Sequence, residues 1–280
     1  MNIQPTSTLD IEKRIGMTSG LINLEGNQIH LEVAGKGLPI VFLHDGIADS
    51  RSFDDQFKFF AENYTAIRYD RHGYGLSKPP SVAYSEVNTL KSLFNQLGLE
   101  TAILIGGSAG GRLALNFAIT HSTCVAALVL AGPAVSGLGF TDHMLNRGWR
   151  NEWGDSIPEF IDFWVNDPWI IAEENPQARA KLRHILETSN QNLMNFPVEV
   201  IDDVEALPRL SEINVPTLII LGESDIADNH AHAGVIQVSV KDSKRKVIPH
   251  AAHLVFMEQP EKFNEIVKEF LDGYFSNQAI

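Results

Sequence analysis

The chain has little of several features that mark large classes of protein. Its 280 residues include one cysteine, which excludes an internal disulfide framework and fits a reducing cytoplasm. Its 22 basic residues form no cluster and, with 35 acidic residues, leave a net charge of −13, which argues against nucleic acid or an anionic membrane as partner. No apolar run reaches the roughly 18 residues that cross a bilayer, and the first residues lack a secretory signal pattern. We therefore expect a cytoplasmic protein without a membrane or nucleic-acid partner.

What the chain does contain is typical of a globular α/β protein. Hydrophobic residues make up 44% of it and charged residues 20%. Short β-branched runs alternate with helical patterns, which indicates βαβ units around a mostly parallel sheet. We expect strands at residues 21–25, 29–35, 38–44, 64–70, 101–107, 126–132, 216–222 and 245–249. The first two flank Gly26 and Asn27, so an antiparallel hairpin is expected there.

Two helices are marked clearly by their apolar spacing. Residues 85–98 place apolar side chains on one face and end at Gly98, a typical residue just beyond a helix. Pro260 opens a second helix, which runs to residue 275 with its apolar face toward the core.

One long segment breaks the alternation of strands and helices. Between residues 137 and 210 the pattern shows helical pieces, at 156–167 and 176–191, and no convincing strand. We therefore expect a helical lid at 137–210, inserted between core segments 1–136 and 211–280. All four tryptophans lie inside it and are candidates for substrate contact: Trp149, Trp153, Trp164 and Trp169. The alternative for each ring is that it packs the lid onto the sheet.

The stretch "GGSAG" at residues 106–110 carries the strongest chemical signal. It fits G-x-S-x-G between a strand and a helix. A sharp strand-to-helix turn strains its corner residue, and glycines at 106 and 110 remove collisions across the turn. Ser108 would then stand above the carboxyl edge of the sheet, over a helix N-terminus that favours a developing anion. A phosphate-binding loop is excluded, because no lysine follows and the dinucleotide spacing is absent.

A serine hydroxyl is a weak nucleophile, so Ser108 needs a base and a carboxylate that orients the base. In this architecture the acid and then the histidine follow the serine along the chain. Asp225 comes just after the strand at 216–222, and His253 comes just after the strand at 245–249. The three residues thus stand in the chain order expected for a triad in this architecture.

Five motifs in register make the chain resemble the α/β-hydrolase superfamily, in the group with a helical lid after the sixth strand. They are FLHDG, YDRHGYGLS, GGSAGG, LGESD and HAAHLVFMEQPEKF, and the match runs from about Gly20 to Tyr274. The resemblance implies an α/β-hydrolase fold, with a mostly parallel eight-stranded sheet flanked by helices and a small helical lid. These motifs are specific for the superfamily and not for one reaction.

The acid and the base both have competitors nearby. Glu223 and Asp228 compete with Asp225, whose distance from the strand end favours it. His250 competes with His253, but the family ending favours His253 and leaves His250 as a surface residue.

The resemblance also implies an oxyanion hole, formed by the backbone N–H groups of Gly46 and Ala109. Here the sequence departs from the family pattern, with Asp45 where glycine is usual and His72 where many members have arginine. A carboxylate aimed at the hole would repel the oxyanion, so we expect Asp45 to point away or to pair with a basic neighbour. The basic neighbours are His44, Arg71 and His72.

Three further residues could suggest other chemistry. His230 and His232 form an isolated H-x-H without carboxylate or cysteine ligands, which is more typical of a solvated loop or helix start than of a metal site. Cys124 precedes a strand and is expected to be a small buried residue. We expect neither a metal nor a cofactor.

These observations predict a serine hydrolase that acts on a small, largely apolar ester. Lactone hydrolysis, C–C bond hydrolysis of a diketone and cofactor-free perhydrolysis are alternatives on the same triad. A non-catalytic ligand-binding protein is the alternative from another class, because fold does not imply function. The partner we expect is a small-molecule substrate, and the sequence leaves a homodimer open.

Overall fold

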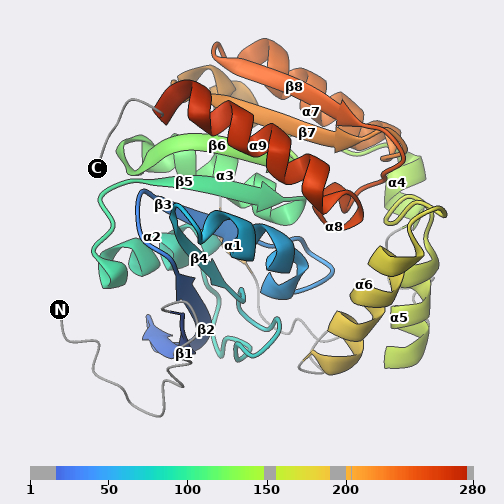
Figure 1. Cartoon of the computed structure of the whole chain (residues 1–280), viewed down its shortest axis with the longest axis horizontal. Coiled ribbons are helices and arrows are strands. Elements are labelled where there is room, and N and C mark those ends of the chain that lie inside the picture. Colours follow the sequence, from blue (N-terminus) through green and yellow to red (C-terminus); the bar gives the residue numbers. More distant parts are fainter. Residues whose placement is uncertain (1–16, 148–155, 190–199, 203, 276–280) are drawn as a thin grey trace.

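A computed structural model describes residues 17–147, 156–189, 200–202 and 204–275, and in them the expected strands form one eight-stranded sheet (Figure 1). The strands are β1 (Thr18–Leu24), β2 (Asn27–Ala34), β3 (Pro39–Leu43), β4 (Thr65–Tyr69), β5 (Ala102–Gly107), β6 (Val125–Ala131), β7 (Thr217–Gly222) and β8 (Ser243–Ile248). Their order is β1-β2-β4-β3-β5-β6-β7-β8. β2 is antiparallel to both β1 and β4, and the other neighbours are parallel. The prediction of a mostly parallel sheet is confirmed.

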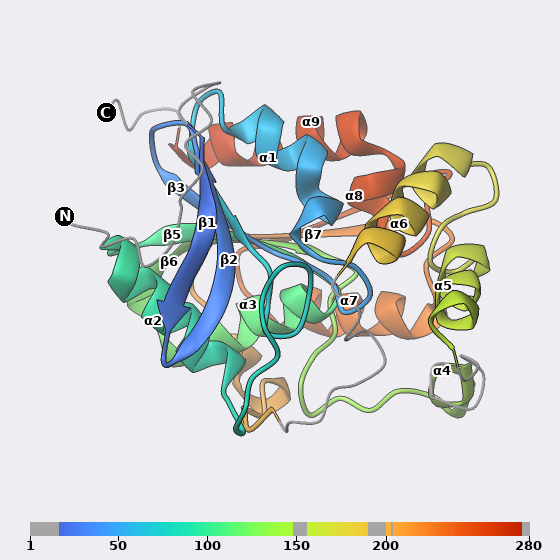
Figure 2. The same cartoon turned by 90° about the horizontal axis from the view of Figure 1, so that it is seen from below.

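Helices cover both faces of this sheet, as Figure 2 shows from below. On one face lie α1 (Asp54–Phe60), α8 (Val255–Glu258) and α9 (Pro260–Phe275); on the other lie α2 (Glu86–Leu97), α3 (Ala109–Thr120) and α7 (Ala227–Ser239). Side chains of a strand alternate between faces, so Ile103 and Ile105 join one core and Leu104 joins the other. Because both faces are buried, the central strands are apolar throughout.

Local signals set the helix ends that the sequence predicted. Ser85 begins α2 by accepting the backbone N–H of Asn88 at 3.0 Å, and Gly98 ends it in the left-handed region with φ 66°. The predicted helix over 260–275 is also confirmed. The sequences of α1 and α7 show no clear apolar spacing of the kind that marks a helix. In α7 the reason is that polar side chains, such as those of Asn229 and His232, are buried on its inner face.

The described residues between β6 and β7, in the segment that we proposed as the lid, include three α-helical stretches. They are α4 (Asp142–Arg147), α5 (Ile157–Asn166) and α6 (Pro176–Thr188). They stand beyond the carboxyl ends of the parallel strands (Figure 1), and α5 packs against α6. Ser156 and Glu159 form a capping box at the start of α5. The described residues after α6 include the short 3₁₀ helix at Leu207–Glu212, which leads into β7.

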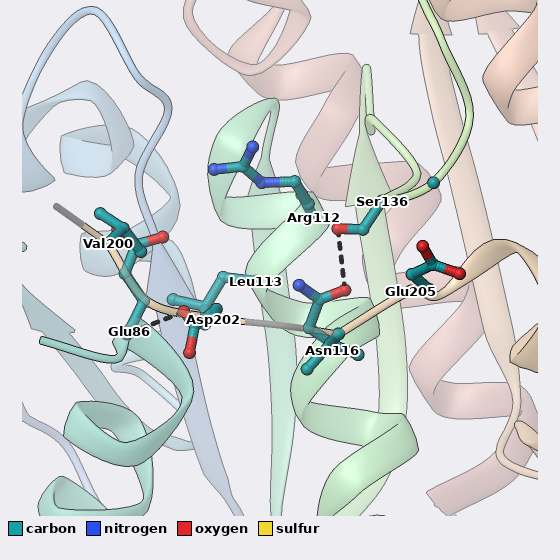
Figure 3. A pocket seen from close by; sticks show the side chains of 10 residues that line it. Glu86, Arg112, Leu113, Asn116, Ser136, Val200, Asp202 and Glu205 are labelled. Carbon is teal, nitrogen blue, oxygen red and sulfur yellow. Dashed lines mark hydrogen bonds between the residues drawn. The ribbon is translucent and has the colours of Figure 1, made fainter.

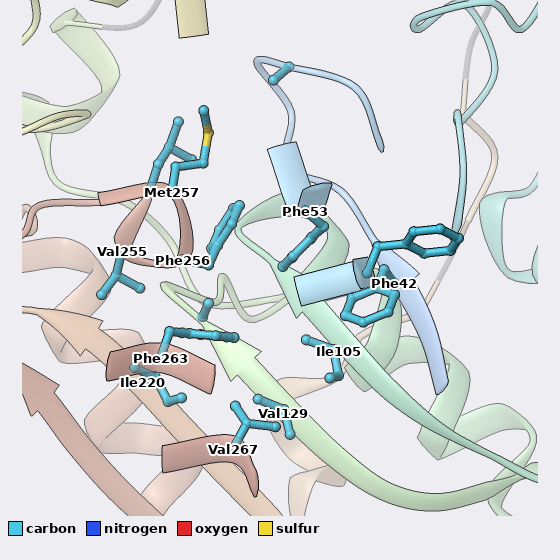
Figure 4. Close-up of a cluster of buried hydrophobic side chains, with 14 of the residues drawn as sticks. Phe42, Phe53, Ile105, Val129, Ile220, Val255, Phe256, Met257, Phe263 and Val267 are labelled. Atoms are coloured by element: carbon cyan, nitrogen blue, oxygen red, sulfur yellow. The ribbon is translucent and has the colours of Figure 1, made fainter. Parts of the chain in front are cut away.

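A cluster of aromatic and aliphatic side chains supports the carboxyl end of β5 (Figure 4). Phe53, from the 3₁₀ helix at Ser50–Phe53, stacks on Phe256 of α8 with ring centroids 4.2 Å apart. A Cβ atom at Gly107 would lie 2.7 Å from the Phe256 ring. The stack therefore requires glycine just before Ser108. No helix in the described ranges is both long enough and apolar enough to cross a membrane.

Candidate active site

Ser108 stands at the corner between β5 and α3, where the sequence predicted a strained turn. Its φ of 52° and ψ of −114° lie in a region that a non-glycine residue rarely adopts. A Cβ atom at Gly106 would lie 2.4 Å from the carbonyl oxygen of Gly110, and one at Gly110 would lie 2.0 Å from that of Leu43. Glycine is thus required at both positions for close backbone approach, as expected.

The loops after β7 and β8 bring Asp225 and His253 together. His253 Nδ1 lies 3.2 Å from each carboxylate oxygen of Asp225. Both residues are buried, with exposed fractions of 4% and 7%. The competing histidine, His250, has a side chain 74% exposed, and its nearest acidic group is Glu174.

The competing acids serve elsewhere. Glu223 is exposed at the start of the loop after β7. Asp228 is buried, and it accepts hydrogen bonds from the backbone N–H of Thr141 at 2.6 Å and from its hydroxyl at 2.9 Å. Of the three acids, Asp225 is the one whose carboxylate meets His253.

Backbone contacts place the Ser108 corner beside this pair. Ser108 donates its backbone N–H to the carbonyl oxygen of Ala131, at 2.8 Å. The next residue, Gly132, packs so closely on the pair that a Cβ atom there would lie 2.8 Å from His253 Nδ1 and 3.1 Å from Asp225 Oδ2. Within the described residues no hydrogen bond joins Ser108 Oγ to His253. In free enzymes such bonds are often long and tighten only when substrate binds.

The surroundings of His253 are acidic. Burial is the largest single influence and lowers its pKa, but the charge and hydrogen bond of Asp225, together with weaker contributions from nearby carboxylates, raise the pKa above the ordinary value. Asp45 and Glu258 act in the same direction. His253 therefore holds a proton to a higher pH than an ordinary histidine.

Gly46 and Ala109, the expected oxyanion donors, are neighbours. A Cβ atom at Gly46 would lie 3.5 Å from the Cβ of Ala109. Among the hydrogen bonds of the described residues, none uses the backbone N–H of either as donor. The Tyr74 hydroxyl donates to the carbonyl oxygen of Gly46 at 3.1 Å, which fixes the orientation of that peptide.

Asp45 braces the loop after β3. Its Oδ1 accepts the backbone N–H groups of Ile47 at 2.8 Å and Ala48 at 2.7 Å, and the residue is fully buried. Its side chain makes no ion pair with a basic neighbour within the described chain. Its backbone oxygen instead accepts from Arg71 Nη2 at 2.7 Å and lies 2.7 Å from His44 Nδ1. Of the two arrangements expected for Asp45, the one with a charged partner is not found among the described residues.

His72 lies away from these groups. It is buried, with Nε2 3.2 Å from the Thr89 hydroxyl and its ring centroid 4.4 Å from that of Tyr84. Burial lowers its pKa. Arg71, one residue earlier, forms the charged pair of this region, donating to Glu86 at 2.5 Å.

Comparisons with known proteins decide the family. A model of the alpha/beta hydrolase family matches residues 40–266. The chain belongs to this family. A 2-hydroxy-6-oxononadienedioate/2-hydroxy-6-oxononatrienedioate hydrolase of Comamonas testosteroni is 25% identical and spans 89% of this chain and 92% of its own length. A putative 2-succinyl-6-hydroxy-2,4-cyclohexadiene-1-carboxylate synthase of Bacillus subtilis is 30% identical over 73% of this chain and 80% of its own.

Solved structures show the same fold. The enol-lactonase of Burkholderia xenovorans superposes with a TM-score of 0.78 at 20% identity, covering 90% of this chain and 99% of its own. The carboxylesterase CesB of Bacillus subtilis has a TM-score of 0.77 at 22% identity and covers 93% of each chain. The protein is therefore an alpha/beta hydrolase enzyme, and its relatives carry out several hydrolytic reactions.

In this hydrolase the proposed lid is bonded directly to the His253 loop. His253 donates its backbone N–H to the carbonyl oxygen of Trp169 at 3.1 Å. Glu258 of α8 accepts the backbone N–H groups of Ala172, in the lid, and of Ala252, both at 2.8 Å. One buried carboxylate thus ties the lid to the loop that carries His253, a role that the sequence motif around Glu258 did not reveal.

Sequence reasoning also missed Asn229. Its side-chain Nδ2 donates to Asp225 Oδ1 at 2.8 Å and lies 2.9 Å from His253 Nδ1. The only signal in the sequence is its position four residues after Asp225, which places both on one face if a helix begins between them.

The tryptophans of the hydrolase fall into three groups. Trp149 and Trp153 lie outside the described residues. Trp164 packs beside Phe163, with ring centroids 5.1 Å apart, and against the hydrophobic core. Trp169 is 39% exposed and adjoins the His253 loop. Trp169 is therefore the described tryptophan whose backbone contacts the His253 loop.

The remaining candidates from the sequence, His230, His232 and Cys124, contact protein groups away from the Asp225–His253 pair. His232 is buried in α7, accepts the backbone N–H of Val135 at 2.9 Å and stacks on Phe140, so the expectation of a solvated position was wrong. The cause is a buried backbone donor that only a polar side chain can satisfy. His230 lies 2.8 Å from Arg245 Nη2. Cys124 is buried, as expected, and the described residues contain no group of three His, Cys, Asp or Glu that could hold a metal.

A cavity of about 310 Å³ lies on the α2 and α3 side of the sheet (Figure 3). Arg112 and Asn116 of α3 face it, and Asp202 and Glu205 come from the segment that leads back to β7. Asn116 accepts the Ser136 hydroxyl at 3.2 Å. Neither Ser108 nor the Asp225–His253 pair lines this cavity.

Proposed function

We propose that this enzyme is a serine hydrolase that cleaves a small, largely apolar carboxylic ester through an acyl-enzyme. The observation that carries the proposal is the convergence of a strained Ser108 with the buried Asp225–His253 pair at the carboxyl edge of the sheet. A side chain whose pKa is perturbed by burial together with a specific charged partner, as for His253 beside Asp225, is a candidate for a functional site.

In the first half of the reaction, Ser108 Oγ attacks the ester carbonyl and passes its proton to His253 Nε2. Asp225 holds the imidazole through Nδ1 and stabilises the imidazolium. The N–H groups of Gly46 and Ala109 stabilise the oxyanion of the tetrahedral intermediate. The intermediate collapses when His253 protonates the leaving alkoxide, which departs as an alcohol and leaves Ser108 acylated.

In the second half, His253 takes a proton from water, and the resulting hydroxide attacks the acyl carbon. Collapse of the second intermediate releases the carboxylic acid and returns the proton to Ser108. The overall reaction consumes the ester and one water molecule, releases the alcohol and the carboxylic acid, and needs no cofactor. Trp169 lies next to the His253 loop, to which its carbonyl oxygen is hydrogen-bonded, and is 39% exposed, so we propose its ring as a contact of the acyl or alcohol group.

C–C bond or lactone hydrolysis is the second candidate, favoured by the names of the relatives. Several relatives are named as hydrolases of 2-hydroxy-6-oxo dienoates, which carry a carboxylate. In the described lid, the two arginines of α6 already have partners. Arg179 donates to the carbonyl oxygens of Val165 and Ile171, and Arg183 donates to Asp162 at 2.7 Å. These contacts support an uncharged substrate.

A fluorophosphonate probe and a substrate panel test the proposal together. We expect rapid labelling of the wild type at Ser108, no labelling of Ser108→Ala, and a loss of ester turnover of at least about a thousandfold in Ser108→Ala and His253→Ala. His250→Ala is the matched control and should stay near wild type. Absence of labelling would favour a ligand-binding protein, and faster turnover of diketones or lactones than of p-nitrophenyl esters would favour the second candidate.

A further inference from the structure

Asn229 occupies an unusual place between the acid and the base of the proposed triad. Its side chain is buried, with 4% exposed, in the first turn of α7. Nδ2 lies 2.8 Å from Asp225 Oδ1 and 2.9 Å from His253 Nδ1. The same carboxylate oxygen also accepts the backbone N–H of Ile226 at 2.8 Å. Asn229 therefore touches both partners of the Asp225–His253 contact at shorter distances than they have from each other.

The donor and acceptor roles of these groups conflict. An ionised carboxylate only accepts hydrogen bonds, so the amide nitrogen of Asn229, and not its oxygen, must face Asp225. A neutral imidazole donates from one nitrogen and accepts at the other. If His253 Nδ1 carries the proton, it donates to Asp225 but faces a second donor at 2.9 Å. If Nδ1 is bare, it accepts the other N–H of Asn229, and Nε2 carries the proton.

We propose that Asn229 is a positioning residue that competes with Asp225 for His253 Nδ1 and so sets which imidazole nitrogen carries the proton. The inference rests on the proposed role of His253 as the base, because only a bare Nε2 can accept the proton of Ser108. Nδ1 is nearer to Asn229, at 2.9 Å, than to either oxygen of Asp225, at 3.2 Å. The shorter contact to a donor is that of a ring whose Nδ1 is bare and whose Nε2 carries the proton.

The competition has a consequence for the working pH of the enzyme. An imidazolium donates from both nitrogens, so the Asn229 amide opposes it as well as the neutral Nδ1–H form. The charged groups that act on His253 are Asp225, Asp45 and Glu258, and all three favour the imidazolium. Asn229 therefore counters three carboxylates and lowers the pH at which the ring becomes neutral, but the neutral form that it favours carries its proton on Nε2 and cannot accept the proton of Ser108.

Two variants separate this role from mere packing. Asn229→Ala removes the amide, and Asn229→Asp keeps the shape but replaces the donor with an acceptor. We expect both to move neutral His253 toward the Nδ1–H form and to raise the pH at which the imidazolium loses its proton, the second more than the first. If the midpoint rises by about one unit in Asn229→Ala, the plateau of kcat/KM should rise by up to about tenfold, because a larger share of the neutral ring then has the bare Nε2 that accepts the proton of Ser108. Asn264→Ala, at a buried asparagine of α9, is the matched control.

The readouts are ¹⁵N NMR of the ring nitrogens in histidine-labelled protein, with the His253 signals assigned by their loss in His253→Gln, and the pH profile of kcat/KM. Unchanged ring signals and an unchanged midpoint of the pH profile in both variants would overturn the inference. A rate loss at all pH values without a change in the ring signals would also overturn it, since that is a packing effect. If Ser108→Ala kept full turnover, the proposed function would fail, while the ring signals would still decide the role of Asn229.

Discussion

Asp45 and Asp225 are two buried carboxylates that follow different strands at the carboxyl edge of the sheet, and they differ in what they bind. Asp45 follows β3 and accepts two backbone N–H groups of its own loop, from Ile47 and Ala48. Asp225 follows β7 and meets a titratable ring, His253, from another loop. Their exposed fractions, 0% and 4%, are nearly equal. Burial therefore does not distinguish the two carboxylates. Their partners do, because only Asp225 contacts a side chain that can gain and lose a proton.

The comparison also explains how the chain tolerates an acid where its family usually has glycine. The turn that Asp45 closes leaves the next peptide, at Gly46, with an N–H group unused by the described residues and beside Ala109. A carboxylate whose oxygen is satisfied by the two following N–H groups can hold the loop while the N–H of Gly46 stays available. The same residue type thus orients an imidazole in one loop and shapes a backbone in the other.

The largest effect expected from this comparison is at Asp225. Asp225→Asn should lower kcat by roughly 10⁴-fold with the fold intact, because an amide favours the wrong imidazole tautomer. Steady-state ester hydrolysis, together with circular dichroism, measures both properties. Glu223→Gln is the matched control and should stay within about threefold of wild type, because Glu223 is exposed. If the two variants ranked in the opposite order, the acid would have to be reassigned to position 223.

Much of this site could be predicted from residue order and spacing alone. Ser108, Asp225 and His253 each follow a strand that apolar patterning reveals, and parallel strands bring their carboxyl ends to one edge. The strict glycines at 106 and 110 follow from the turn between β5 and α3. Such features are local, or depend on strand order, so the sequence carries them.

Contacts that depend on how separate elements pack could not be predicted. Asn229 meets His253 only because α7 begins just after Asp225 and faces the loop after β8. Glu258 reaches the lid backbone at Ala172 across the interface between α8 and the segment before α6. His232 was misjudged for the same reason, because its backbone partner at Val135 is far away in the sequence. No short motif encodes these pairings.

A second effect should appear in the pH profile. Burial lowers the pKa of His253, but the charge and hydrogen bond of Asp225, with the charges of Asp45 and Glu258, outweigh burial, so the folded pKa lies above the ordinary value near 6.5. The base must be unprotonated, so kcat/KM should fall tenfold per pH unit below a midpoint that lies above 6.5. The folded state gains stability from the protonated pair, and this gain should be lost as pH rises through the same midpoint.

The pH profile of kcat/KM, with unfolding measured in parallel, checks both statements. Asp45→Asn removes one carboxylate that acts on His253 and should move the midpoint slightly downward. Glu212→Gln is the control, because that exposed acid pairs with Arg209 and lies outside the site. An acid limb with a midpoint clearly below 6.5 would contradict the assignment of His253 as the limiting group.

A smaller effect is expected at Asp45. The same Asp→Asn substitution is made there as at Asp225, so the two results can be compared directly. Asp45→Asn keeps an oxygen that can accept the N–H groups of Ile47 and Ala48, so kcat on the pH plateau should fall only a few-fold. Asp45→Ala loses the acceptor and should cost about 1–3 kcal/mol of unfolding free energy. Denaturant unfolding and plateau rates measure these outcomes. A clear gain in rate with Asp45→Asn would mean that the carboxylate opposes the oxyanion.

The smallest signal should come from the lid, whose contact with the site is through Trp169. This ring is 39% exposed, and the carbonyl oxygen of the same residue holds the backbone N–H of His253. An apolar ester analogue bound to the Ser108→Ala protein should shield the ring from water, so the fluorescence should shift to shorter wavelength by a few nanometres, a rough expectation for partial burial of an indole. Trp164→Phe should keep this shift, since Trp164 packs against Phe163 within the lid. Trp169→Phe should remove it. Loss of the shift in Trp164→Phe and its persistence in Trp169→Phe would place the substrate against α5 instead of beside the His253 loop.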